Sequence, residues 1–225
     1  RNKVYRGHGG IVVGSEMSGG ARDIFVEDCT FMGTDKGIRF KTTRGRGGLV
    51  ENIHIRNINM SDIVQEAIFF DMYYWTRPPA ANEVQVIPKV TEETPRIENI
   101  FIENVVCKGA NSGVFIRGLP EMPVQRVYLS NLIITADKGV EIKDAAGIFI
   151  KNASFFSKDT YPLVYLENTK DLLFDRLQYN GGLQQLVEVN GKASANIEFR
   201  NSRIDPSQTS FKHGASGDAV KLINE

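Results

Sequence analysis

The side chains best suited to bind an acidic ligand lie together in the segment Gly37-Ile38-Arg39-Phe40-Lys41. In an extended strand, Ile38 and Phe40 point to one face, so Arg39 and Lys41 point together to the other face, about 7 Å apart. Two cations on one face can hold a carboxylate, and an arginine guanidinium can do so through two parallel hydrogen bonds. The spacing therefore favours a binding site for a sugar that carries a carboxylate.

A second candidate is His8, which stands between glycines in Gly7-His8-Gly9-Gly10. A histidine in such a segment is open to close backbone approach and is seldom part of a core. The other two histidines, His54 and His213, fall far from this segment, and we assign them no role.

A repeated five-residue pattern predicts the elements that position these side chains. Its first and third positions are aliphatic or Phe, and alternation with a period of two indicates a strand with one buried face. The seven copies start at Ile24, Ile53, Ile100, Val127, Ile148, Leu172 and Ile197. The starts are 29, 47, 27, 21, 24 and 25 residues apart, and only the 47 departs widely from one common period. Such regular self-similarity is typical of solenoids.

The fifth position of the pattern is the most uniform. Its occupants are Asp28, Asn57, Asn104, Asn131, Asn152, Arg176 and Asn201. Asparagine tolerates left-handed backbone, so the column predicts a repeated turn, and stacked copies would let the amides form a ladder. A second short strand follows each first one, as in Gly37–Phe40, and there is no helical period. We therefore predict an all-β, right-handed parallel β-helix, because a β-sandwich explains the alternation but not the asparagine column.

The repeat also divides the chain. We expect β-helix coils over residues 1–206, with a long loop inserted at residues 75–96, where the wide spacing leaves about 22 extra residues. The loop holds half of the eight prolines and the only tryptophan, Trp75, and loops of this length are usually functional or disordered. We expect residues 207–225 to cap the stack. The first repeat is incomplete, so we also expect further coils before Arg1.

Composition excludes several classes of protein. Lys+Arg and Asp+Glu both number 27, and this zero net charge argues against a nucleic-acid partner. No apolar run approaches the roughly 18 residues of a membrane span. Cys29 and Cys107 are too few for a disulfide framework and are expected as free thiols in the core. Without a cluster of Cys and His we expect no metal and no cofactor, and we expect a monomer.

The repeat register gives each cation its neighbours. Lys41 falls over Asp71 and then Arg117, and alternating charges on adjacent strands can stabilise a sheet without binding anything. For Lys41 a structural role and a binding role therefore both stay open. Arg39 falls on Phe69 and has no acidic neighbour in register, which favours a binding role.

The two motifs together resemble a known family. Gly7-His8-Gly9, followed about 30 residues later by Arg39-Phe40-Lys41, is similar to the Gly-His-Gly and Arg-Ile-Lys motifs of glycoside hydrolase family 28, the polygalacturonase-like enzymes. The stretch from Gly7 to Lys41, including Gly14 to Gly20, resembles bacterial exo-acting members in particular. The resemblance implies a single-stranded, pectin-lyase-like β-helix whose N-terminal coils are missing from this chain. It also implies inverting hydrolysis of α-glycosidic bonds in pectin, outside the cell or in the periplasm.

The resemblance assigns roles to individual residues. It implies that His8 helps to keep the catalytic carboxylates in their working protonation state. It implies that Arg39 and Lys41 bind the carboxylate of a galacturonate unit of an acidic polysaccharide. A tyrosine on the next coil lines the same subsite in the family, and Tyr74 matches it best, with Tyr73 as the alternative.

The sequence departs from the family at the catalytic acids. In the family these lie in an Asn-Thr-Asp motif and an Asp-Asp pair before Gly-His-Gly, and this sequence contains neither. Asp35 lies between the two motifs, on the later coil, and does not match. Inverting hydrolysis needs one acid and one base, so we expect this chain to carry the sugar subsite of a hydrolase and to be inactive alone. Two alternatives are a non-catalytic carbohydrate-binding or adhesin β-helix and a pectate-lyase-like enzyme, which would need carboxylates around Ca²⁺.

Overall fold

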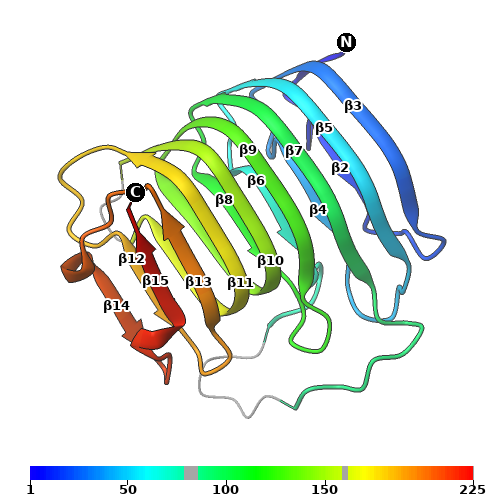
Figure 1. Ribbon diagram of the computed structural model, residues 1–225. Coiled ribbons are helices and arrows are strands. Elements are labelled where there is room, and N and C mark those ends of the chain that lie inside the picture. The colour runs from blue at the N-terminus through cyan, green and yellow to red at the C-terminus, as the bar shows by residue number, and fades with distance from the viewer. Residues whose placement is uncertain (79–85, 159–161, 225) are drawn as a thin grey trace.

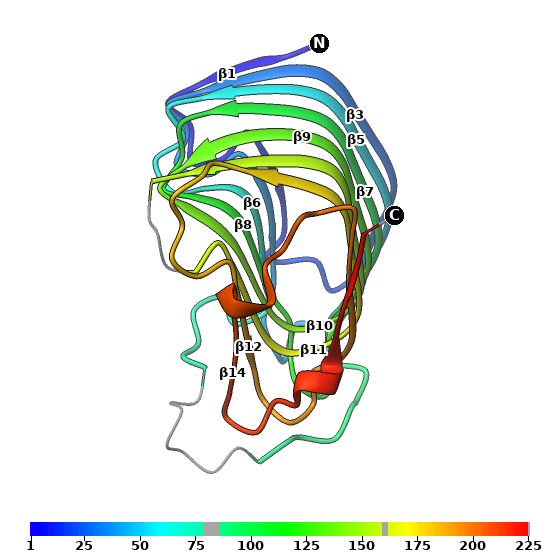
Figure 2. The ribbon, with the colours of Figure 1, turned by 60° about the vertical axis from the view of Figure 1, so that its left-hand side comes forward.

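The computed structural model describes residues 1–78, 86–158 and 162–224. Its strands stack coil upon coil, and the chain passes along the stack in order from the N-terminal to the C-terminal end (Figure 1). The paired strands are parallel throughout, and the coils overlie one another in the second view (Figure 2). The predicted parallel β-helix is confirmed.

One side of the solenoid, here called the front sheet, consists of short parallel strands. They are β2 (Ile11–Val13), β4 (Ile38–Lys41), β6 (Glu66–Asp71), β8 (Ser112–Arg117), β12 (Val187–Asn190), β14 (Thr209–Lys212) and the first parts of β10 (Lys138–Ser157) and β11 (Val164–Tyr179). Arg39 pairs in register with Phe69, and Lys41 pairs with Asp71, which in turn pairs with Arg117. The predicted neighbours of both cations are therefore confirmed.

Most of the other sides are built by longer strands that turn corners without ending. They are β3 (Ala21–Met32), β5 (Leu49–Ser61), β7 (Arg96–Lys108), β9 (Val124–Ala136) and the later parts of β10 and β11. Two short strands, β13 (Ala195–Arg200) and β15 (Val220–Ile223), continue these sides toward the C-terminus. The short strand β1 (Lys3–Tyr5) pairs with the end of β3. The pattern predicted only the first half of each long strand, and β5 continues past Asn57 to Ser61.

The predicted asparagine turn is a one-residue corner inside each long strand. Asn57, Asn104, Asn131 and Asn152 have φ of 58°, 55°, 56° and 51°. The side-chain amide of each donates to the residue below it in the stack, over 3.0 Å from Asn57 to Asp28 and 3.0–3.1 Å from each later member to the previous one. The left-handed conformation costs asparagine less free energy than it costs most other residues, and the ladder gives its side-chain amide a hydrogen-bond partner. The predicted ladder is confirmed.

A second column of left-handed residues lies five positions before the first one in the sequence. Its members are Asp23, Asn52, Asn99, Arg126, Gly147, Asp171 and Asn196. Some contact their neighbours, as where Asn196 donates to Asp171 over 2.6 Å. The sequence analysis missed this corner, although six of its seven occupants are Asp, Asn or Gly, the residue types that most readily adopt left-handed backbone.

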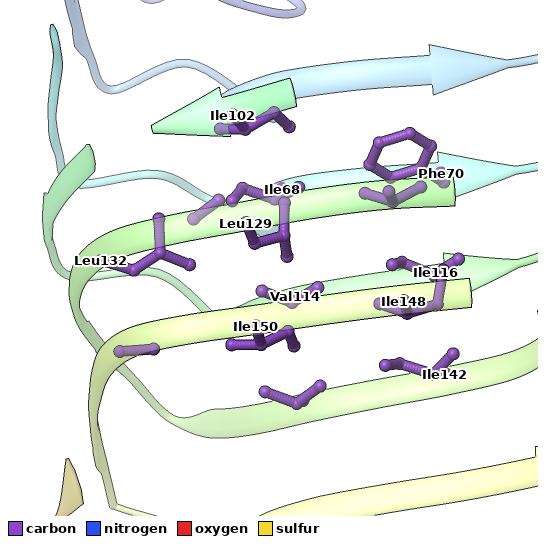
Figure 3. Packing of buried hydrophobic residues seen from close by; sticks show 14 of the residues in the cluster. Ile68, Phe70, Ile102, Val114, Ile116, Leu129, Leu132, Ile142, Ile148 and Ile150 are labelled. Carbon is purple, nitrogen blue, oxygen red and sulfur yellow. The ribbon is translucent and has the colours of Figure 1, made fainter. Parts of the chain in front are cut away.

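The core is filled by the inward positions of the repeat. Ile53, Ile100, Val127 and Ile148 are fully buried in one column. Figure 3 shows residues such as Ile68, Val114, Leu129 and Ile150 packed in layers inside the solenoid. The two cysteines are free and buried, as predicted, and desolvation raises the pKa of the Cys107 thiol to about 12.

The loop and the C-terminal segment complete the chain. Between Asp71 and Arg96, the described parts of the predicted loop contain no strand, and residues 79–85, including Pro79, lie outside the described residues. In the described part of the predicted cap, β14 pairs with β12 and β15 pairs with β13. Short 3₁₀ turns, Pro206–Gln208 and Gly217–Ala219, precede these two strands. None of the helical segments in the described residues is long and apolar enough to span a membrane.

Candidate functional site

Arg39 and Lys41 lie on the outer side of β4, as their spacing predicted. Ile38 and Phe40 between and beside them are fully buried, and the Phe40 ring stacks on the Phe70 ring of the next coil at 4.5 Å between centroids. The core packing on one side of β4 therefore fixes which side chains the strand presents on the other.

His8 connects an acidic side chain to Arg39. His8 Nδ1 lies 2.6 Å from Asp35 Oδ2, and His8 Nε2 lies 2.6 Å from Arg39 Nη1. Because a guanidinium can only donate, Nε2 must accept the hydrogen bond from Arg39. Nδ1 therefore carries the proton and donates to Asp35, so these contacts select one neutral tautomer of the imidazole.

Arg39 points outward but is covered, with only 4 % of its surface exposed. Its guanidinium carbon lies 5.8 Å from the Phe69 ring centroid and 5.5 Å from that of Tyr74. Its Nε is buried and has no hydrogen-bond partner among the described residues. Burying an ionised group without a carboxylate to balance it is costly. A carboxylate supplied by a ligand would complete this environment.

Lys41 lies against Tyr74, not against the acid next to it in register. Its Nζ is 4.3 Å from the Tyr74 ring centroid. The Asp71 carboxylate is held by Arg117 in two hydrogen bonds, of 2.8 and 3.0 Å, and accepts a third from the Tyr73 backbone N–H at 3.0 Å. Lys41 makes no ion pair with any described residue. The charge alternation expected along this column is thus realised by Asp71 and Arg117 without Lys41.

The alternative tyrosine, Tyr73, lies in a different environment. It is buried, and desolvation raises the pKa of its hydroxyl. Arg44 Nη2 donates to this hydroxyl over 3.4 Å, and the guanidiniums of Arg44 and Arg117 lie 5.0 and 5.3 Å from the ring centroid. The structure therefore brings Tyr74, and not Tyr73, to Arg39.

Sequence reasoning missed two charged members of this region. Asp35, set aside because it matches no catalytic motif, contacts His8 directly. Lys36 is buried, with its Nζ 3.9 Å from the Phe69 ring centroid, and it donates to Gln65 over 2.6 Å. Desolvation lowers the pKa of Lys36 despite its contact with Glu66. The signal for Asp35 was present, since the 27-residue offset between paired strands also joins positions 8 and 35.

The remaining histidines lie away from this group. His54 is on a long strand, in a stack of outward rings formed by Phe25, His54, Phe101, Tyr128 and Phe149, with centroids 4.6–5.0 Å apart. His54 Nε2 lies 2.9 Å from Asn52 Oδ1. A cavity of about 320 Å³ on the same face is lined by residues that include Phe25, His54 and Phe101. His213 is exposed, just after β14.

The sequence that forms this arrangement of cations, aromatic rings and a histidine can be compared with the sequences of known proteins. The sequence model for glycosyl hydrolases family 28 matches residues 1–154. The chain belongs to this family. The matched region holds every residue of the candidate site, and it supports the family that the two motifs indicated.

Individual relatives of this family 28 chain are polygalacturonases by name. It is 32 % identical over 124 residues to a probable polygalacturonase of Vitis vinifera, over 55 % of this chain and 24 % of the relative. It is 24 % identical over 160 residues to an exo-poly-alpha-D-galacturonosidase of Dickeya chrysanthemi, over 68 % of this chain and 26 % of the relative. The chain thus spans about a quarter of the length of these relatives. No solved structure matches it.

Proposed function

We propose that this chain is part of an enzyme that hydrolyses α-glycosidic bonds in a galacturonic-acid-containing polysaccharide such as pectin, with inversion, outside the cell or in the periplasm. One observation carries the proposal. Arg39 is buried beside Lys41 and Tyr74 without a carboxylate partner among the described residues, in a chain whose relatives are named polygalacturonases.

In this proposal, Arg39 and Lys41 bind the carboxylate of one galacturonate unit. Hydrogen bonds between two charged groups are shorter and stronger than neutral ones, so the anionic sugar binds here in preference to a neutral sugar. Tyr74, already in contact with Lys41, forms the wall of the subsite. His8 holds Arg39 in place and, as a neutral imidazole, adds no further positive charge.

The proposal places the acid and base of the reaction in other parts of a longer protein. An inverting glycosidase needs two carboxyl groups about 6.5–9.5 Å apart. The Asp35 carboxylate is hydrogen-bonded to His8, and the sequence holds neither an Asn-Thr-Asp motif nor an adjacent Asp pair. We therefore propose that the 225-residue chain binds its substrate but does not hydrolyse it.

Two measurements on the purified chain test this function. Isothermal titration with trigalacturonate is expected to show binding, and a reducing-end assay on polygalacturonate is expected to show no product. Absence of binding to any galacturonate oligomer would overturn the proposed subsite, and release of reducing ends would overturn the inactivity. The same assays on the longer protein separate the enzyme from a non-catalytic carbohydrate-binding or adhesin β-helix, for which binding would again occur without turnover.

A further inference from the structure

We propose that Trp75 is a second sugar-binding element, which stacks on the uncharged face of the sugar next to the one held by Arg39, Lys41 and Tyr74. This inference rests on the proposed function, since it concerns the same bound polymer. It extends the candidate site to a residue that belongs to neither of the two sequence motifs.

The Trp75 side chain is the most open large apolar group in the described residues, with 82 % of its surface exposed. Among the described residues its indole contacts one other aromatic ring, that of Tyr74, with the centroids 5.0 Å apart and the ring planes at 62°. In an edge-to-face contact of this kind, one ring covers at most one face of the other. At least one face of the indole is therefore free.

The free indole is continuous with the charged subsite. The Tyr74 ring contacts Trp75 on one side and lies 4.3 Å from Lys41 Nζ and 5.5 Å from the Arg39 guanidinium carbon. A ligand with a carboxylate at Lys41 and Arg39 would bring its next ring toward the indole. A polymer of uronic acids offers both features, because each pyranose ring carries a carboxylate and faces formed by C–H groups.

The backbone that presents Trp75 is fixed by hydrogen bonds. The Tyr74 N–H donates to the Thr42 carbonyl over 3.0 Å, and the Thr76 N–H donates to the Tyr73 carbonyl over 2.8 Å. Trp75 itself has φ of 66°, a left-handed conformation that is rare for a bulky side chain. Residues held in such conformations cluster at binding and active sites.

A single exposed apolar residue on a protein surface is ordinary and needs no function. Trp75 differs in three respects together. It lies in a turn held by backbone hydrogen bonds, its own backbone is in the left-handed conformation, and its ring contacts Tyr74, which lies beside Arg39 and Lys41. Tryptophan is also among the residues that most often dominate binding energy, because it buries a large area with few rotatable bonds.

The chain contains one tryptophan, so its fluorescence reports on this position alone. Titration of the 225-residue chain with trigalacturonate is expected to change the tryptophan emission saturably, with the dissociation constant found by calorimetry. Trp75→Ala is expected to weaken trigalacturonate binding about tenfold by calorimetry, and Trp75→Phe by less. Phe25→Ala is the matched control, because Phe25 is 72 % exposed on a different side of the solenoid, and its affinity is expected to stay unchanged.

The outcomes separate this inference from the proposed function. Suppose that wild type binds trigalacturonate and that Arg39→Ala does not. If Trp75→Ala then binds as tightly as wild type, the proposed role of Trp75 is wrong, and the proposed subsite of Arg39, Lys41 and Tyr74 stands. If wild type does not bind at all, both are wrong. A melting temperature for Trp75→Ala equal to that of wild type shows that a loss of affinity does not come from unfolding.

Discussion

His8, in the bend between β1 and β2, and His54, on β5, lie in opposite kinds of environment. His8 belongs to a chain of polar contacts, Asp35–His8–Arg39, that ends at a buried guanidinium nitrogen with no partner among the described residues. His54 lies between two rings, 5.0 Å from Phe25 and 4.6 Å from Phe101, within a stack that repeats from coil to coil.

The difference shows how a repeating scaffold can reveal a site. On the long strands, asparagine amides and aromatic rings are satisfied by equivalent residues one coil away, so the columns complete one another. On β4 the columns break, because Arg39 meets Phe69 and Lys41 meets Tyr74. Side chains that the repeat does not satisfy are the ones left for a ligand.

Loss of the unpaired cation is expected to have the largest effect. Arg39→Ala should weaken trigalacturonate binding by about 2–5 kcal/mol, because a buried charged contact with the ligand carboxylate is lost. The melting temperature should change little, since the side chain has no carboxylate partner among the described residues that would be left unbalanced. Calorimetric titration and thermal unfolding of the same preparation measure the two quantities.

The matched control is Arg117→Ala, on the same sheet but with a partner. It leaves the buried Asp71 carboxylate without its two hydrogen bonds from Arg117, so stability should fall by about 3–5 kcal/mol. If Arg39→Ala binds trigalacturonate as wild type does and its melting temperature falls strongly, Arg39 is a structural residue. The side chains of β4 would then not differ from the repeated columns on the long strands.

The asparagine ladder should show the reverse behaviour. Asn131 donates to Asn104 and accepts from Asn152, and it has φ of 56°. Asn131→Ala should lower the free energy of unfolding by about 2 kcal/mol through two lost hydrogen bonds and a strained alanine, with ligand affinity unchanged. Asn131→Gly, which accepts the left-handed backbone, should recover part of the loss in urea unfolding. Equal stabilities of wild type and Asn131→Ala would show that the ladder contributes nothing.

Asp144 has φ of 46° at the corner between the two parts of β10, and it should make the stability sensitive to pH. Burial, and then the Glu167 carboxylate, raise the pKa of Asp144 to about 7. The folded state therefore binds a proton more tightly than the unfolded state does, and stability should fall as pH rises from about 4 to about 7. Asp144→Asn should remove this dependence and stabilise the protein at pH 8 by on the order of 1 kcal/mol. Identical pH profiles of urea unfolding for the variant and wild type would contradict the assignment.

The smallest effect is expected at the stacked histidine. His54→Phe keeps a flat ring between Phe25 and Phe101 and loses only the contact with Asn52. Unfolding free energy should change by less than about 0.5 kcal/mol, and trigalacturonate affinity should not change. A loss above about 1 kcal/mol would show that the hydrogen bond, and not the stack, holds His54 in place.

Much of the fold was predictable because one column kept its chemistry. The asparagines of the ladder reported both the coil length and a left-handed corner. The second corner was missed, although its occupants are Asp, Asn or Gly in six of seven coils and these residue types tolerate left-handed backbone. Only at Arg126 must the surrounding coils hold the corner against the preference of the side chain.

The site divides in the same way. The alternation of β4 predicted the side of Arg39 and Lys41 but not that Arg39 is covered, because Tyr74 comes from the turn after β6. The choice between Tyr73 and Tyr74 also needed the structure, since neither lies in a strand whose period would fix its direction. Asp35 was missed because it was judged against a motif, although the repeat offset placed it beside His8.

The chain leaves the solenoid after Asp71 and rejoins it at Arg96, yet the pairing of Asp71 with Arg117 and the contact of Asn57 with Asn104 are the same as between coils with no insertion. The cost of closing a loop grows slowly with its length, by about 0.6 kcal/mol for each doubling. This segment can therefore be lengthened, shortened or exchanged during evolution without a change in the packing of the core. The solenoid is therefore a scaffold in which the length of this loop and the stability of the core can change separately.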